Sequence, residues 1–158
     1  MKKFTILALA CAALFLAAAP RLSAQTDVSL NFGAVTDKSF SFNPFLWTAG
    51  MVVDIYLGPH FSLSPEGFIM VHNFDFGGFF VAPAVLLNYQ GGGFFIGGGL
   101  TKWWLAGSDV GGSYSSDVAM KMNLGFKGSN LKLTVFAVTA FSEFMKEPVL
   151  GATFGFVF

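Results

Sequence analysis

From residue 25 onward the chain is strongly apolar, yet no apolar run approaches the length of a membrane helix, about 20 residues. Glycine, proline, asparagine and aspartate interrupt it at short intervals. Only 11% of the residues are charged, whereas a typical soluble domain has about 25%. A chain of this kind has one other way to cross a bilayer. It can form a sheet that closes on itself, because lipid offers no partners to the backbone groups of an open edge.

Eight segments have the composition of strands, rich in Val, Ile, Phe, Tyr and Trp and bounded by turn residues. They cover residues 27–35, 45–57, 61–73, 78–89, 93–104, 114–126, 131–143 and 148–158. Each has about nine to thirteen residues, enough for a tilted strand to cross a bilayer. We therefore predict an all-β fold, a transmembrane antiparallel up-and-down β-barrel of about eight strands that forms one domain over residues 25–158.

The connections between these segments alternate in length. The tight ones are residues 58–60, 90–92 and 128–130, and the longer ones are 36–44, 73–77, 105–113 and 144–147. If the first strand starts on the periplasmic side, all the tight turns fall there and all the longer loops fall outside, as in transmembrane barrels. The loop around residues 105–113 is the predicted contact surface.

Charged residues in the middle of the segments share one face of the alternating pattern, which we predict to be the lumen. These residues are Asp54, Glu66, Lys121 and Lys132. The interior of a small barrel is only wide enough for side chains, and an unpaired charge there costs several kcal/mol. We therefore predict a plug of paired charges. A gate, or a path for protons or ions, is the alternative.

Glycines on the same face leave open whether the lumen is filled. They are Gly33, Gly50, Gly97, Gly99, Gly125, Gly151 and Gly155. Large side chains from other strands can occupy the space, and otherwise a narrow apolar cavity remains. The candidates are Phe68, Phe80, Phe95, Trp103 and Phe136. Pro83 lies inside the fourth segment, and because proline removes a ladder hydrogen bond we expect a bulge or irregular pairing there.

The end of the chain carries the most specific pattern. Leu150, Ala152, Phe154, Phe156 and Phe158 alternate with smaller residues up to the last position. This resembles the C-terminal signature that the barrel assembly machinery recognises in outer-membrane proteins. The whole pattern is similar to the small eight-stranded families of the OmpA membrane domain, OmpX and OmpW types. The resemblance implies a monomer in contact with outer-membrane lipid.

The first 24 residues have the order of a secretory signal: Lys2 and Lys3, then an apolar core, then a small residue at Ala24, after which we expect cleavage. This predicts export through the general secretory pathway. An uncleaved helical anchor is the alternative, although it would be short. The remaining chain has six lysines and nine acidic residues and no basic patch, so nucleic acid is not an expected partner. The only cysteine is Cys11, inside this leader.

Two enzyme families use eight-stranded outer-membrane barrels, the lipid A palmitoyltransferase and the lipid A deacylase. Each needs a histidine and serine arrangement near the external rim, which His60 and His72 do not provide. We predict no catalytic residue, no cofactor and no metal. The predicted function is non-enzymatic, a structural or surface-interaction role. One alternative is an OmpW-like narrow channel or carrier for small hydrophobic molecules. Another is a soluble lipocalin-like barrel with the inverse facing.

Overall fold

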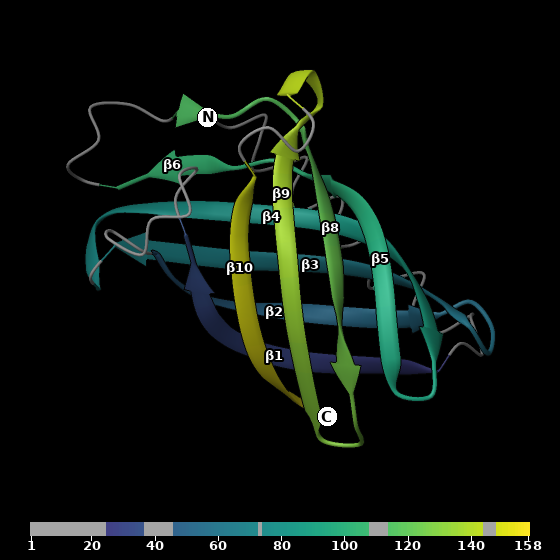
Figure 1. Cartoon of the computed structure of the whole chain (residues 1–158). Helices are drawn as coiled ribbons and strands as arrows, with labels where there is room; N and C mark the ends of the chain where they lie inside the picture. Colours follow the sequence, from purple (N-terminus) through teal and green to yellow (C-terminus); the bar gives the residue numbers. More distant parts are fainter. Residues whose placement is uncertain (1–24, 37–45, 73, 108–113, 144–147) are drawn as a thin grey trace, which may run out of the picture.

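The computed structural model describes residues 25–36, 46–72, 74–107, 114–143 and 148–158. These residues form a single antiparallel sheet that closes into a barrel (Figure 1). Its strands are β1 (Thr26–Val35), β2 (Leu46–Tyr56), β3 (Phe61–His72), β4 (Asp75–Gly91), β5 (Phe94–Thr101), β6 (Trp104–Ala106), β7 (Tyr114–Ser115), β8 (Ala119–Lys127), β9 (Leu131–Ala140) and β10 (Val149–Val157). A short 3-10 helix, η1 (Phe141–Glu143), follows β9.

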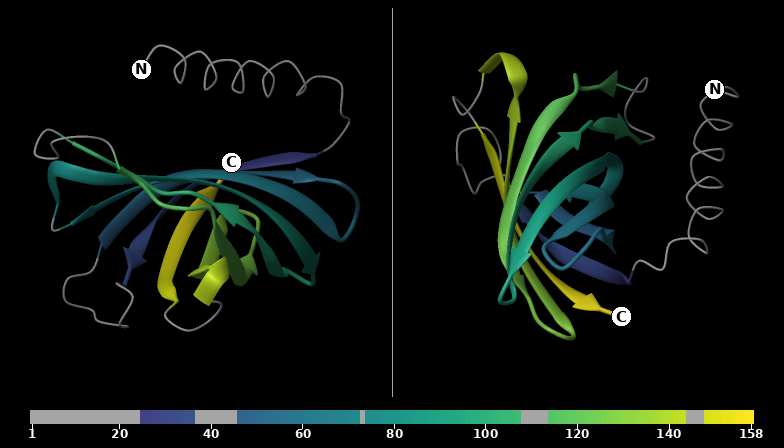
Figure 2. Two further views of the ribbon diagram at one scale, coloured as in Figure 1. Left: turned by 90° about the horizontal axis from the view of Figure 1, so that it is seen from above. Right: turned by 90° about the vertical axis from the view of Figure 1, so that its right-hand side faces the viewer.

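The barrel wall has eight strands. Going around it, β1, β2, β3, β4, β5, β8, β9 and β10 each pair with the next, and β10 pairs back with β1. β6 continues β5 and pairs with β4, while β7 pairs with β6. In Figure 1, β8, β9 and β10 cross in front of β1, β2 and β3 at a steep angle, as expected where strands tilt from a barrel axis. Figure 2 shows the sheet curling round from two further directions. The predicted fold is confirmed.

Burial is reversed relative to a soluble protein. Polar side chains are buried inside the wall, including Ser29, Asn31, Thr48, Asp54, Ser62, Ser64, Asn88, Lys121, Asn123, Lys132 and Thr153. Large apolar side chains are exposed on its outside, including Leu30, Met51, Ile69, Leu87, Ile96, Leu100, Leu124, Val135 and Phe154. The alternation within each strand places them there, because successive side chains point to opposite faces. A lipocalin-like barrel would have an apolar interior and a polar exterior, so this facing contradicts that alternative.

Several strand boundaries differ from the prediction. β8 covers Ala119–Lys127 rather than 114–126, and residues 114–115 form the separate strand β7. β5 ends at Thr101 rather than at residue 104. β4 runs from Asp75 to Gly91 rather than over 78–89, because β3 pairs with Asp75 at one end and β5 pairs with Gln90 and Gly91 at the other. β9 ends at Ala140 rather than at residue 143. Its described pairing with β8 ends at Ala140 and its pairing with β10 ends at Val138, so the backbone beyond has no ladder and turns into η1.

The wall is irregular beside Pro83, as predicted, and the irregularity lies on one side only. Pairing with β3 is regular there, with Gly67 opposite Pro83. On the other side β5 stops at Thr101 and β6 starts at Trp104. The amide N–H of Lys102 donates to the Pro83 carbonyl (3.3 Å), but proline has no N–H to return the hydrogen bond. The missing donor therefore accounts for the break between β5 and β6.

The three tight turns gather at one end of the barrel, where residues from each of them line the same cavity. The longer loops 36–44, 105–113 and 144–147 lie wholly or largely outside the described residues, as does the predicted signal over residues 1–24. In the part of the chain that the structure describes, no helix has the length and hydropathy needed to cross a membrane.

Candidate functional site

Asp54 is the centre of an ion network in the half of the lumen near the tight turns. Its carboxylate is buried and contacts Lys132 Nζ through both oxygens, at 2.8 and 3.0 Å. Lys127 Nζ lies 2.6 Å from Oδ2, and the Ser64 hydroxyl donates to Oδ1 at 2.7 Å. Four hydrogen bonds from three side chains thus satisfy one carboxylate, which is what a buried charge requires.

A second ion pair, between Lys121 and Glu66, lies further along the lumen. Both side chains are only 6% exposed. The Lys121 ammonium also sits between two aromatic rings, 4.2 Å from the centroid of Phe136 and 4.9 Å from that of Phe68. Cation–π contacts of this kind strengthen when water is excluded. Lys121 therefore packs in one layer with a carboxylate and a ring from β3 and a ring from β9.

The structure places all four residues of the predicted cluster in the lumen and brings them together as two pairs. Asp54 on β2 pairs with Lys132 on β9, and Glu66 on β3 pairs with Lys121 on β8. β2 and β3 are not neighbours of β8 and β9 in the sheet, so both pairs cross the lumen.

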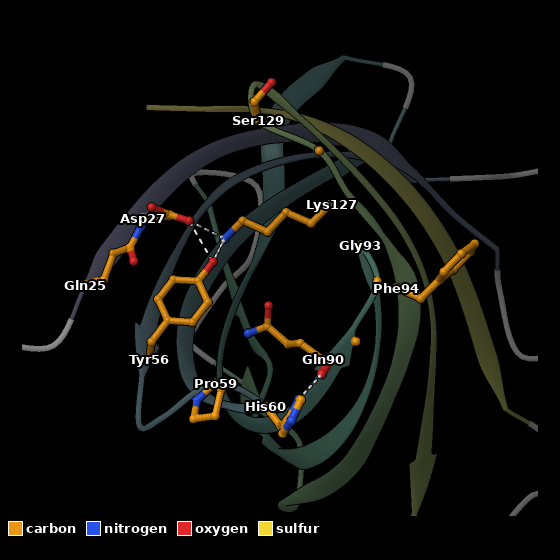
Figure 3. Close-up of a pocket in the computed structure, with 13 residues that line it drawn as sticks. Gln25, Asp27, Tyr56, Pro59, His60, Gln90, Gly93, Phe94, Lys127 and Ser129 are labelled. Atoms are coloured by element: carbon orange, nitrogen blue, oxygen red, sulfur yellow. Dashed lines mark hydrogen bonds and ion pairs between the residues drawn. The ribbon is translucent and has the colours of Figure 1, made fainter.

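Three further members of the network, which were not predicted from the sequence, line the cavity in Figure 3. Lys127 Nζ lies 2.9 Å from Asp27 Oδ2 and 2.9 Å from the Tyr56 hydroxyl, and that hydroxyl donates to Asp27 at 2.7 Å. The alternation already contained the signal, because Lys127 shares the face of Lys121. The predicted sixth strand ended at residue 126, one position too early.

The lumen opens at this end into a cavity of about 480 Å³. Asp27, Tyr56 and Lys127 form one wall, and Gln90 and His60 lie on the other (Figure 3). Two further spaces along the lumen, both lined by described residues, are small. The next space, around Asp54, Lys132 and Phe95, has a volume of about 0 Å³, and the one around Lys121 and Glu66 has about 10 Å³. The latter has room for about one water molecule.

The lumen glycines are covered by atoms of neighbouring strands. Three of them lie directly opposite a phenylalanine in the sheet: Gly50 and Phe68, Gly125 and Phe95, Gly151 and Phe136. At each of these positions a Cβ atom would overlap the phenylalanine ring. Cβ atoms at Gly97 and Gly155 would overlap Asn88 and Asn31, and those at Gly33 and Gly99 would meet neighbouring backbone. These glycines thus leave space for the side chains that fill the interior. Designed sheets also pair glycines with aromatic side chains.

Towards the longer loops the lumen has no buried charge among the described residues and is mainly apolar, with Thr48, Thr101 and Thr139 also buried there, which the charge pattern did not predict. Its buried cluster consists of Val35, Val52, Phe68, Met70, Ala82, Phe136 and Val138, against which Leu46, Phe80, Trp103, Ala119 and Val149 pack. Phe80 and Trp103 contact each other with ring centroids 6.0 Å apart. The described lumen therefore has an ionic half and an apolar half.

The predicted assembly signal lies on the outside of β10. Phe154 and Phe156 are exposed, as is Phe158 beyond the strand end, while the intervening residues 151, 153, 155 and 157 are buried. β10 pairs on one side with β1 and on the other with β9, so it is the strand that closes the barrel. Recognition by the assembly machinery stays a prediction.

The two histidines lie at the barrel ends. His60 is in a tight turn, where Nδ1 lies 3.2 Å from the Gln90 carbonyl oxygen and the ring stacks on Tyr89 at 5.7 Å. His72 ends β3 and is exposed. Among the described residues, no three His, Cys, Asp or Glu side chains gather as metal ligands would.

No protein-family model matches the sequence, and no curated protein matches it. The structure is similar to the N-terminal β-barrel domain of Pseudomonas aeruginosa OprF, with a TM-score of 0.50 and 13% identity over 86% of this chain and 100% of that one. Neisserial surface protein A (NspA) has a TM-score of 0.48 and 8% identity, over 86% of this chain and 97% of that one. Ail, the attachment invasion locus protein of Yersinia pestis, has a TM-score of 0.39 and 13% identity, over 85% of this chain and 97% of that one. At such identities the OprF likeness establishes a shared fold. The chain is therefore a small eight-stranded β-barrel of the outer-membrane type.

Proposed function

We propose that the chain is a non-enzymatic protein of the outer membrane, with a structural or surface-interaction role exerted outside a closed lumen. The observation that carries this proposal is the packing of the lumen. Two ion pairs and the rings of Phe68, Phe95 and Phe136 leave spaces of about 10 and 0 Å³ between the walls. With a closed interior, only the outer wall and the loops can contact other molecules.

The outer surface supports a membrane location. Soluble monomers seldom expose apolar patches of more than a few hundred Å², whereas here exposed Leu, Ile, Val, Met and Phe side chains occur on every long strand. Aromatic rings cluster at the end with the tight turns, where Phe61 contacts Tyr89 at 5.5 Å and Phe94 contacts Phe126 at 5.5 Å. Such rings are typical of the interface between lipid and water.

Membrane insertion is tested by gel migration. The folded chain in detergent should migrate differently before and after boiling, and it should need detergent to stay in solution. A chain that remains soluble and monomeric without detergent would overturn the membrane location.

Conductance in planar bilayers tests the closed lumen. The wild-type chain should give no resolved current steps. The variant Lys121→Ala/Phe136→Ala, which removes a cation and a ring from the middle of the lumen, should leak ions. A matched variant on the outer wall, Leu133→Ala/Val135→Ala, should stay silent. Resolved steps from the wild type would reject the closed lumen in favour of the channel alternative. A silent Lys121→Ala/Phe136→Ala variant would show that this layer is not what closes the lumen.

Accessibility on intact cells tests the surface role. An epitope inserted after Asp109, in the predicted external loop, should bind antibody without permeabilisation. An epitope inserted after Ser129, in a tight turn, should bind only after permeabilisation. The reverse pattern would contradict the predicted orientation.

A further inference from the structure

Lys102 differs from the other lysines of the barrel wall. Among the side chains that the structure describes, six charged ones on the strands point into the lumen: Asp27, Asp54, Glu66, Lys121, Lys127 and Lys132. Lys102 points outward instead. Its neighbour Trp103 packs inside the lumen against Phe80. Lys102 itself lies opposite Pro83 of β4. Because successive side chains alternate between the faces, Lys102 and Trp104 share the lipid-facing side.

The position of Lys102 along the wall places its ammonium at a membrane surface. Phe94, at the tight-turn end of β5, lies eight residues before it, which corresponds to about 26 Å of strand. With a tilt of about 35–45°, this is a rise of about 19–22 Å within an apolar band about 25 Å tall. A lysine side chain can extend upward over the remaining distance to the polar interface. Trp104, two residues further on, then lies at the interface itself.

The Lys102 ammonium has no counter-ion among the described side chains. Its Nζ lies 5.7 Å from the centroid of the Trp104 ring. A lysine on the lipid face is unfavourable by about 2–4 kcal/mol at the bilayer midplane and by about 0–1 near the interface. The charge thus lies on the outer wall without a salt bridge to a described side chain.

The outer wall beside Lys102 has short side chains. Lys102 lies opposite Pro83 on β4, and Pro83 lies opposite Gly67 on β3. A Cβ atom at Gly67 would meet no atom within 4 Å, so the wall is open there. Met51 and Ile69, each 49% exposed, flank this position. The wall therefore has an apolar strip without long side chains next to an isolated cation.

We propose that Lys102 and Trp104 bind the phosphate group of an anionic lipid in the leaflet on the side of the longer loops, with an acyl chain of that lipid lying along Gly67 and Pro83. The proposal rests on the proposed membrane location of the barrel. Charge complementarity selects the occupant, since an unpaired ammonium at the edge of an apolar wall favours a lipid that has both a negative group and a hydrocarbon chain.

Quenching of tryptophan fluorescence by brominated lipids tests this site. The full chain carrying Trp47→Phe, which removes another lipid-facing tryptophan, is placed in phosphatidylcholine bilayers. These contain a fixed fraction of brominated-chain phosphatidylglycerol or, as the neutral comparison, brominated-chain phosphatidylcholine. Trp104 then reports the lipid next to Lys102, while Trp103 inside the lumen adds the same background to each sample.

We expect the phosphatidylglycerol to associate about fivefold more strongly than the neutral lipid, the factor equivalent to about 1 kcal/mol for one lysine near the surface. Lys102→Gln should bring the ratio to about one, and Lys102→Arg should keep it high. A ratio near one in the parent chain, or an unchanged ratio in Lys102→Gln, would overturn the lipid site while leaving the barrel in place. If neither brominated lipid quenches the fluorescence, the chain is not in the bilayer, and the proposed membrane location fails together with the site.

Discussion

Replacing Lys121 with methionine should destabilise the barrel strongly, because it removes one partner of a buried ion pair. Lys121 is 5% exposed, pairs with Glu66 and lies between the rings of Phe68 and Phe136. Methionine has a similar length and keeps contact with the rings through its sulfur. The change therefore leaves the volume nearly constant and deletes the charge.

The magnitude follows from these contacts. Breaking a buried pair by removing one partner costs about 3–5 kcal/mol, because the other charge stays buried alone. The lost cation–π contacts, about 1–2 kcal/mol, are partly offset by sulfur–aromatic contacts of about 0.3–1.5 kcal/mol. We expect the free energy of unfolding to fall by about 3 kcal/mol or more, which at a slope of about 2 kcal/mol per molar lowers the urea midpoint by about 1.5 M. The double variant Lys121→Met/Glu66→Gln should return to within about 1 kcal/mol of wild type.

The assay is reversible urea unfolding in lipid vesicles, followed by tryptophan fluorescence and by the fraction that migrates as the folded form on a gel. Lys102→Met is the matched control, since it makes the same substitution at a lysine with no described counter-ion. It should change the unfolding free energy by less than about 1 kcal/mol. An unchanged midpoint for Lys121→Met, or a double variant less stable than Lys121→Met alone, would refute the reasoning.

Two further predictions concern the wall. Gly151→Val should destabilise the barrel by about 1–3 kcal/mol in the same unfolding assay, because its side chain would overlap the ring of Phe136, whereas Gly67→Ala, with open space outside, should be nearly neutral. Equal effects of the two would contradict the packing described. Pro83→Val should restore the missing donor to Lys102, add about 0.5–1.5 kcal/mol of stability, and slow hydrogen exchange of the neighbouring amides. Faster exchange there would show that the proline is not what interrupts the ladder.

Much of the fold was predictable because its rules are local. A strand has a side-chain period of two, so the lumen positions of Asp54 and Lys132 follow from counting along the chain. Turn residues mark where each strand ends, and the lengths of the connections separate the two ends of the barrel. Errors occurred where a segment's partner decides its extent. β4 begins at Asp75, before Gly77 and Gly78, because His72 at the end of β3 pairs with Asp75. Lys127 was missed because it is the last residue of β8.

The sequence by itself determined that the chain builds a barrel of about eight strands and which side chains turn inward, since both depend on alternation and on turn chemistry. Only the tertiary structure decided which charges pair and whether the lumen is hollow. Asp54 meets Lys127 and Lys132 across the barrel, and Gly151 meets Phe136 in a neighbouring strand. Both contacts depend on the register between strands and on closure of the sheet. Neither quantity is encoded in any one segment, because each is fixed by all eight strands packing around one shared interior.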